Sequence, residues 1–386
     1  MNLDVTQKPF IVFWELTRAC MLACKHCRAK AQKKRHPNEL TTEECFNVIE
    51  QLKRFGKPYP LLIITGGDPL LREDLFEIIE YAKDFRVAIA FSGTKLANKS
   101  KLKKLKDAGV ARIAISIDGS NAEIHDGFRG VKGTFEMSME ILKNALELGI
   151  PIQMNTTVTN HNIHDLPNIM KLAIQSKVIL WDVFFIVPTG RAKAEMMPSP
   201  QQFEDILNWL YDVSKKTPLN VKSSAATHLR RIELMRERNE ELQLGELYFK
   251  LKAKLDKICS EIECKNEEKR IVAGGHGRSL ANGIRRMLGI TDGRGMFFIS
   301  HIGEVYPSGF LPIVAGNVRN ESLKEIYLKS KIFQDLKNPN NLKGKCGLCE
   351  YRFICGGSRA RAYAIRGDYL EEEPCCIYKP KNLVKN

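Results

Sequence analysis

Short apolar segments alternate with amphipathic segments along the first half of this chain, and this alternation constrains the fold more than any other feature. Strands are expected at residues 10–14, 61–65, 87–91, 112–117, 152–158 and 180–187. Helical spacing of apolar residues is found at 72–84, 98–108, 135–148 and 166–176, and after Thr41, which forms a capping-box pattern with Glu44. Six βα units in series predict an α/β fold with a parallel sheet covered by helices, either an open partial barrel or a doubly wound sheet.

Three cysteines follow the first expected strand, at the edge of the sheet where parallel folds place their working sites. Cys20, Cys24 and Cys27 form a C-x3-C-x2-C pattern. Because a [4Fe-4S] cluster normally has four cysteine ligands, three thiolates on one loop would leave one iron open for a ligand that is not protein. Zinc also binds closely spaced thiolates, but zinc knuckles use C-x2-C pairs with a second pair further along the chain. The spacing therefore favours an iron–sulfur cluster over zinc.

Composition narrows the class of protein further. The chain has 386 residues, enough for more than one domain, and no run of eighteen apolar residues that could span a membrane. Residues 1–6 lack the basic and apolar regions of a signal peptide, so we expect a cytoplasmic protein. Its eleven cysteines then indicate metal or cluster binding rather than disulfides. The net charge of +15 is consistent with a solvated basic surface or an acidic substrate or partner, and less with nucleic acid, because basic and acidic residues are mixed.

The second half of the chain has a different organisation. Residues 201–270 are highly charged and predict solvated helices, and residues 274–278 predict a loop. Residues 296–300 and 304–306, on either side of Gly303, predict a β-hairpin. We therefore expect three parts: a barrel over 1–200, a charged helical connection over 201–290 and a second module over 291–386.

A second group of cysteines lies near the end of the chain. Cys346, Cys349 and Cys355 are spaced C-x2-C-x5-C, and Cys375 and Cys376 follow. This spacing is compatible with a second iron–sulfur cluster and with a zinc ribbon. The remaining cysteines match no motif: Cys45, which is expected in the core, and Cys259 and Cys264, which are expected to be structural or free.

The first half of the chain resembles the radical S-adenosylmethionine (SAM) enzymes. The three early cysteines correspond to the signature of that family. Further motifs end the second, fourth, fifth and sixth strands in the expected order: Thr65-Gly66-Gly67-Asp68-Pro69, Ser116-Ile117-Asp118-Gly119, Asn155-Thr156-Thr157 and Val187-Pro188-Thr189-Gly190-Arg191. The resemblance covers residues 8–195. It implies a partial (β/α)6 barrel of the TIM type, with a [4Fe-4S] cluster on the three cysteines and SAM bound at the carboxyl edge of the sheet.

The resemblance also implies which residues bind SAM: His26, Gly66, Gly67, Asp68, Ser116, Asp118, Arg129, Asn155 and Val187. The glycine turn would contact the methionine amino group, and Asp68 stands where the family commonly has glutamate. The two polar residues that end the fourth strand would accept hydrogen bonds from the ribose. Asn155 and Arg129 would hold the ribose and the methionine carboxylate, which an arginine fork can bind with two hydrogen bonds. His26 would pack near the adenine.

The C-terminal cysteines resemble the SPASM/twitch extension of the same family, a small α+β domain that holds an auxiliary [4Fe-4S] cluster. The implied ligands are Cys346, Cys349, Cys355 and Cys376. The family ends this segment with Asp/Glu-Pro-x-Cys-x-Tyr, which favours Cys376 over Cys375. Ser308 stands where full SPASM members have a cysteine, so the resemblance implies one auxiliary cluster.

These resemblances imply an activity. The reduced cluster would pass an electron, supplied by a donor such as flavodoxin or ferredoxin, to SAM, and the resulting 5′-deoxyadenosyl radical would take a hydrogen atom from an unreactive carbon. Residues 14–18, 128–131, 187–191 and 355–361 are similar to heme-pathway members, which oxidatively decarboxylate a tetrapyrrole propionate. Two alternatives stay open: a maturase of ribosomally made peptides and, outside the enzymes, a zinc-dependent nucleic-acid-binding protein.

Overall fold

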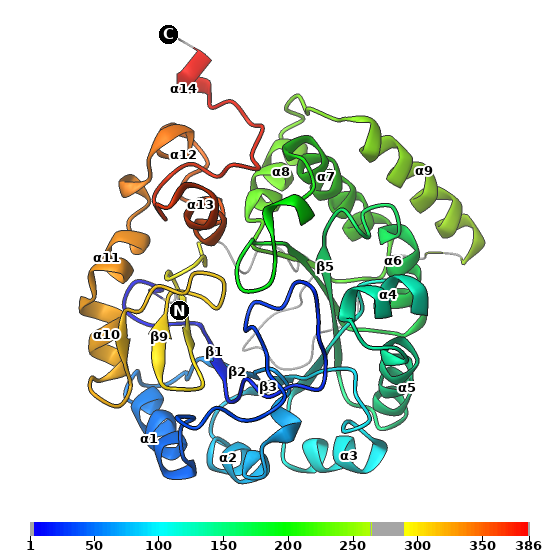
Figure 1. The fold of residues 1–386 in the computed structure, drawn as a ribbon. Helices are drawn as coiled ribbons and strands as arrows, with labels where there is room; N and C mark the ends of the chain where they lie inside the picture. Colours follow the sequence, from blue (N-terminus) through cyan, green and yellow to red (C-terminus); the bar gives the residue numbers. More distant parts are fainter. Residues whose placement is uncertain (1–3, 263, 265–288, 385–386) are drawn as a thin grey trace.

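One sheet organises the fold. The computed structural model describes residues 4–262, 264 and 289–384. The strands are β1 (Ile11–Glu15), β2 (Leu61–Thr65), β3 (Val87–Ala90), β4 (Arg112–Ser116), β5 (Ile152–Val158), β6 (Leu180–Phe185), β7 (Val221–Ser224), β8 (Met296–Ile299), β9 (Glu304–Tyr306) and β10 (Gly316–Asn317). They join in the order β10-β9-β8-β1-β2-β3-β4-β5-β6-β7 (Figure 1). Strands β1 to β7 are parallel and follow one another without a reversal of order, which confirms the partial barrel and not the doubly wound sheet.

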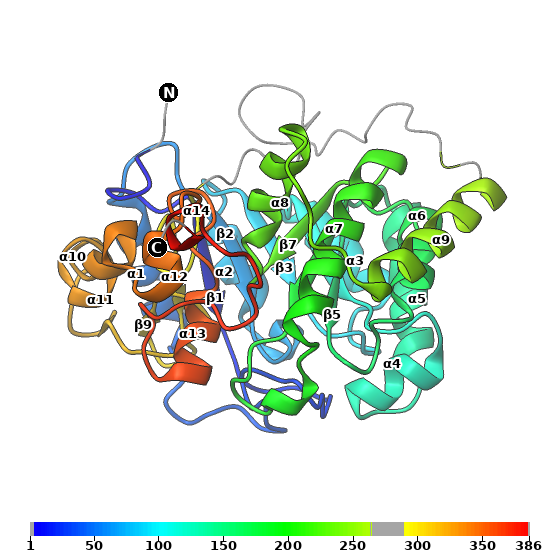
Figure 2. The same cartoon turned by 90° about the horizontal axis from the view of Figure 1, so that it is seen from above.

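Helices surround the sheet. They are α1 (Thr42–Lys53), α2 (Leu75–Tyr81), α3 (Lys99–Asp107), α4 (Ala122–Arg129), α5 (Thr134–Glu147), α6 (Leu166–Gln175), α7 (Pro200–Lys216), α8 (His228–Glu237), α9 (Glu246–Glu261), α10 (Leu323–Lys329), α11 (Lys331–Lys337), α12 (Gly344–Leu348), α13 (Arg359–Arg366) and α14 (Lys381–Val384). Figure 1 shows α1 to α6 around the outside of the strands, and Figure 2 shows α10 to α13 on the opposite flank from α4 to α6. Within the described residues, every helix is too short or too polar to cross a membrane.

One apolar core joins the barrel to the C-terminal segment. Trp14, Trp181 and Trp209 are fully buried in it, and so is Tyr327 of α10. The inner strands are apolar on both faces because helices cover one face and the barrel interior covers the other. The core therefore extends past residue 291 without a break in the packing.

The predicted hairpin is present and is part of the main sheet. Strand β9 runs antiparallel to β8, and β8 pairs parallel with β1, from Ile11 opposite Met296 to Trp14 opposite Ile299. The C-terminal segment thus covers the edge of the first strand, which would otherwise have unpaired backbone groups.

One strand lies in the region that was expected to be helical. Val221–Ser224 forms β7 and pairs parallel with β6. Its sequence lacks apolar alternation because Lys222 and Ser224 hydrogen-bond the buried carboxylate of Asp182, at 2.7 and 2.8 Å. The prediction of helices alone over 201–270 was therefore wrong at this point, and the predicted loop at 274–278 lies outside the described residues.

Two helices also differ from the expectation. Helix α4 (Ala122–Arg129) was not predicted, because Gly127 and several polar residues interrupt its apolar pattern. Helix α9 was expected to be solvated, but one face is buried, and its Tyr248 hydroxyl donates to Asp212 of α7 at 2.8 Å. At the end of α9, Cys259 is joined to Cys264 by a disulfide, whereas Cys45 is buried in the core as expected.

The capping box at the start of α1 is present as predicted. The Thr41 hydroxyl accepts a hydrogen bond from the Glu44 N–H at 3.2 Å, and the Glu44 carboxylate accepts one from the Thr41 N–H at 2.9 Å. Replacing Thr41 by alanine removes one of these bonds and is expected to lower the free energy of unfolding by about 1 kcal/mol. Denaturant titration would measure this, and Thr41→Ser, which keeps the hydroxyl, should stay close to the unmodified protein. An equal loss in both variants would contradict the capping role.

Candidate active site

The three early cysteines line one cavity of about 210 Å³ at the carboxyl ends of the strands. Seven other residues predicted from the sequence lie on its wall: His26, Gly66, Gly67, Ser116, Arg129, Asn155 and Val187. Asp68 and Asp118 are fully buried and do not line it. The strands β2, β4, β5 and β6 therefore bring together most of the predicted site, because each ends at the same edge of the sheet.

Hydrogen-bond donors point at the sulfurs of this cysteine loop. The N–H groups of Leu22 and Ala31 donate to the sulfurs of Cys20 and Cys27, each at 3.4 Å. Arg129 Nη1 donates to Cys24 Sγ at 3.7 Å. Because such donors stabilise negative sulfur, this donor set fits a cluster held by three thiolates.

Burial opposes ionisation of two of these thiols, those of Cys20 and Cys24. It raises the pKa of Cys20 and of Cys24, and Arg129 partly offsets this at Cys24. The Ser92 hydroxyl, which sequence reasoning missed, lies 3.3 Å from Cys20 Sγ. The loop is therefore suited to a cationic partner such as iron rather than to free thiolates.

The segment after β6 holds the cysteine loop in place. Arg191 donates from its N–H to the Cys27 carbonyl at 3.0 Å, from Nε to the Cys24 carbonyl at 2.9 Å and from Nη1 to the Ala31 carbonyl at 3.2 Å. Gly190 has a φ of +67°, and a Cβ there would lie 2.4 Å from the Cys27 carbonyl oxygen. The Thr-Gly-Arg part of the predicted motif thus shapes the cysteine loop.

The glycine turn after β2 packs on the same loop. A Cβ at Gly66 would lie 2.6 Å from the Thr17 carbonyl oxygen, and one at Gly67 would lie 2.4 Å from that of Ala19. The Gly67 N–H donates to the Thr17 carbonyl at 2.7 Å. From the sequence we expected these glycines to let a ligand approach the backbone closely. The structure shows that they also leave room for the backbone of Thr17 and Ala19.

The two buried aspartates position their neighbours. Asp118 forms an ion pair with Arg129 at 2.6 Å, and it accepts a hydrogen bond from the Thr157 N–H at 2.7 Å. Asp68 accepts hydrogen bonds from the Leu70 N–H and the Thr94 hydroxyl, and burial raises its pKa to about 6. Both carboxylates therefore lie behind the cavity wall and fix the residues in front of them.

Several polar atoms on the cavity wall are buried and have no hydrogen-bond partner among the residues that the structure describes. They are His26 Nδ1, Arg129 Nε and Arg191 Nη2. The His26 ring stacks on Phe128 with 4.2 Å between ring centroids, and burial and the charges of Arg129 and Arg191 lower its pKa. Because a buried donor without a partner is costly, these atoms fit a bound ligand with carboxylate and heterocyclic groups.

A charged cluster at the end of β1 links the cysteine loop to β8. Arg28 pairs with Glu15 at 2.9 Å and lies over the Phe298 ring at 4.4 Å, and His301 Nδ1 lies 3.0 Å from the other Glu15 oxygen. Burial by itself would raise the pKa of Glu15. The neighbouring Arg28 and His301 have the opposite effect, and the pKa is lowered. Arg28 lines the cavity, so this cluster is part of the site. Sequence reasoning missed it, although Glu15 directly follows an apolar strand.

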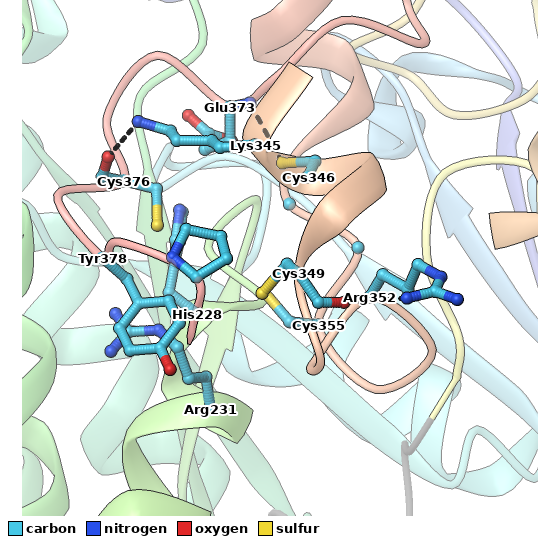
Figure 3. A pocket seen from close by; sticks show the side chains of 13 residues that line it. His228, Arg231, Lys345, Cys346, Cys349, Arg352, Cys355, Glu373, Cys376 and Tyr378 are labelled. Carbon is cyan, nitrogen blue, oxygen red and sulfur yellow. Dashed lines mark hydrogen bonds between the residues drawn. The ribbon is translucent and has the colours of Figure 1, made fainter. Parts of the chain in front are cut away.

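The C-terminal cysteines line a second pocket (Figure 3). Cys346, Cys349, Cys355 and Cys376 all border it, whereas Cys375 packs in the main core. Cys346 Sγ accepts hydrogen bonds from the Glu373 N–H at 3.3 Å and from Arg359 Nη2 at 3.7 Å. Burial raises the pKa of Cys349 to about 12. Four thiols around one pocket, with two donors aimed at the Cys346 sulfur, fit a [4Fe-4S] cluster.

A buried ion pair ties this pocket to the barrel. Arg361 Nη1 lies 3.1 Å from both carboxylate oxygens of Glu373, and neither side chain is exposed. Arg361 also donates to the Ile186 carbonyl at 3.2 Å, at the end of β6. Burial would raise the pKa of Glu373, but Arg361 and His228 lower it, so the carboxylate stays charged. Arg361 thus connects the segment that borders the second pocket to residues at the end of β6, which border the first cavity.

Comparison with known proteins identifies the family. The model of the radical SAM superfamily matches residues 14–173, the segment that contains the first cysteine loop and strands β2 to β5. The chain belongs to the radical SAM superfamily and is an enzyme of that class, which uses a [4Fe-4S] cluster and SAM. This confirms the resemblance found in the sequence and replaces the zinc-dependent nucleic-acid-binding alternative.

Two relatives and one solved structure show which members of this superfamily the chain resembles. The AdoMet-dependent heme synthase of Methanosarcina barkeri is 39% identical over 378 residues, which are 97% of this chain and 98% of that protein. Mycofactocin maturase MftC of Mycobacterium tuberculosis is 28% identical over 380 residues, 96% of this chain and 83% of that protein. The crystal structure of Streptococcus suis SuiB bound to the precursor peptide SuiA matches with a TM-score of 0.68 and 14% identity, over 96% of this chain and 76% of that one. That structural match supports the fold alone.

Proposed function

We propose that this enzyme oxidatively decarboxylates a propionate side chain of an iron–coproporphyrin-type tetrapyrrole. The observation that carries the proposal is the 39% identity to a heme synthase over nearly the whole of both chains, against 28% to a peptide maturase. In this reaction the propionate loses a hydrogen atom, carbon dioxide and one electron, and a vinyl group remains. The basic chain suits a substrate with several carboxylates.

In this proposal the first cavity carries the radical chemistry. Cys20, Cys24 and Cys27 would hold the cluster, and the other seven predicted wall residues would contact SAM. When bound, cluster and SAM would supply a 5′-deoxyadenosyl radical able to take the hydrogen atom. The protein orients the reactants through Arg129 and the glycine turn, and Phe184 and Phe310 on the wall exclude water from the reacting carbon.

The second pocket would take up the electron that the substrate loses. We assign Cys346, Cys349, Cys355 and Cys376 as ligands of one auxiliary [4Fe-4S] cluster. Cys376 borders the same pocket as the other three cysteines, whereas Cys375 packs in the main core, and this supports the assignment over one that uses Cys375. The contact of Arg361 with the end of β6 places this pocket next to the barrel.

The remaining parts of the proposal concern partners and organisation. An acidic one-electron donor such as flavodoxin or ferredoxin would reduce the first cluster, and the enzyme would work in the cytoplasm, where such carriers occur. We retain the division into a barrel over 1–200, a connecting region over 201–290 and a cluster-bearing region over 291–386. The second candidate, a peptide maturase, is supported by the relative that is 28% identical.

Turnover with defined substrates tests the proposal. The protein, reconstituted anaerobically with iron and sulfide, is incubated with SAM, dithionite and iron–coproporphyrin III. We expect 5′-deoxyadenosine, carbon dioxide and a porphyrin with vinyl groups, all detectable by mass spectrometry. The methyl ester of the same porphyrin is the matched control, because it has no free carboxylate to release. Deoxyadenosine without decarboxylation of the porphyrin would contradict the substrate and direct attention to peptides.

A further inference from the structure

His228 is a buried histidine without a hydrogen-bond partner. It is the first residue of α8 and is 1% exposed, and both of its ring nitrogens are buried without a partner in the described protein. Its side chain lines the pocket of the four C-terminal cysteines (Figure 3). No function described so far uses this residue.

An unpartnered buried imidazole needs an explanation. Leaving a buried polar group unsatisfied is costly, and native proteins rarely do so. The charged residues that influence His228 are Glu373, Arg231, Arg361 and Arg359, and none of them hydrogen-bonds its ring. Since the described residues offer the ring no partner, an occupant of the pocket would satisfy it.

The neighbouring contacts indicate which kind of partner this is. The Thr227 hydroxyl, one residue earlier, lies 3.7 Å from Cys355 Sγ, so the start of α8 borders the cysteine sulfurs. Four cysteines line the pocket, one for each iron of a four-iron cluster. An imidazole beside a fully ligated cluster can still donate its N–H to sulfur.

We propose that a ring N–H of His228 hydrogen-bonds a sulfur of the auxiliary cluster and raises its reduction potential. Reduction adds negative charge to the cluster, and a donor aimed at sulfur stabilises that charge. Through this hydrogen bond, His228 would make the cluster a better electron acceptor. The inference rests on the proposed assignment of that cluster to the four cysteines.

Pulsed electron paramagnetic resonance of the reduced auxiliary cluster tests this inference. The full chain carries Cys20→Ala, Cys24→Ala and Cys27→Ala, so that only the auxiliary cluster is observed, and its histidines are labelled with ¹⁵N. We expect a weak coupling to one imidazole nitrogen, which is lost in His228→Phe together with a shift of the midpoint potential to a more negative value. His164→Phe is the matched control, because His164 is exposed and only its carbonyl makes a described hydrogen bond.

The possible outcomes separate this inference from the proposed function. Absence of nitrogen coupling in the labelled parent, or a coupling that persists in His228→Phe, would overturn the hydrogen bond. A coupling as large as that of a directly bound ligand would overturn it as well. If His228→Phe does not assemble a cluster, the labelled parent still decides the question. If the parent itself holds no iron or sulfide, the proposed ligand set fails, and the inference with it.

Discussion

Replacing Cys20, Cys24 and Cys27 together by alanine will abolish SAM cleavage and leave one cluster, or about four irons, in each chain. The three thiols line the cavity, and each accepts a hydrogen bond: Cys20 and Cys27 from N–H groups of the loop, and Cys24 from Arg129. Without them the described wall of the cavity has no thiol left to hold a cluster, whereas the C-terminal pocket is formed by other segments and keeps its four thiols. Iron and sulfide analysis and the yield of 5′-deoxyadenosine, both under anaerobic conditions, measure the two effects.

A matched control is available for this triple replacement. Cys45 is a fully buried cysteine in α1 and lines neither cysteine pocket. Cys45→Ala should retain the iron of two clusters and most of the activity. Survival of SAM cleavage in the triple variant would show that the early cysteines do not carry the reaction.

Gly190→Ala is expected to have the second largest effect, although it changes no ligand. The added Cβ would lie 2.4 Å from the carbonyl oxygens of both Cys27 and Arg28, and the φ of +67° costs an alanine about 1–2 kcal/mol by itself. The cysteine loop must shift to relieve this contact. Since a displacement of about 1 Å at a reacting group can cost about 100-fold, SAM cleavage should fall by about that factor.

Gly109 provides a control that separates the strain of a positive φ from the contact of the added Cβ with the cysteine loop. It has a φ of +80°, but a Cβ there would meet nothing within 4 Å, and it lies between α3 and β4, away from the cavity. Gly109→Ala should lower the free energy of unfolding by about 1–2 kcal/mol and leave SAM cleavage unchanged. Equal activity losses in the two variants would mean that general stability, and not the shape of the cysteine loop, controls the reaction.

The sequence predicted the barrel well because its strands are apolar and evenly separated. The six predicted strands are present, with small changes at their ends, because parallel strands buried on both faces have continuous apolar runs. Strand β7 could not be found in this way. It has four residues at the edge of the sheet, and its polar side chains satisfy a buried aspartate that lies forty residues earlier in the chain.

For the candidate site, the sequence alone predicted only the residues that belong to motifs. The cysteines and the residues that end strands follow local patterns, and the structure brings most of them to one cavity. Arg28 and Ser92 could not be assigned from the sequence, because Arg28 lies over the distant Phe298 ring and Ser92 contacts Cys20, which is 72 residues earlier. The same holds for His228, since nothing near it in the sequence indicates the cysteines that surround it.

The dependence of the cysteine loop on Arg191 also sets an order of events during synthesis. The carbonyl groups of Cys24 and Ala31 are bound by a residue 167 and 160 positions later. A ribosome adds about 5–20 residues per second, so the early thiols wait roughly 8–30 seconds for their support to emerge. The loop therefore takes its final shape only when strands β1 to β6 and the segment up to Arg191 have been made. Iron and sulfide would accordingly be delivered after the sixth strand has been made rather than to the early chain alone.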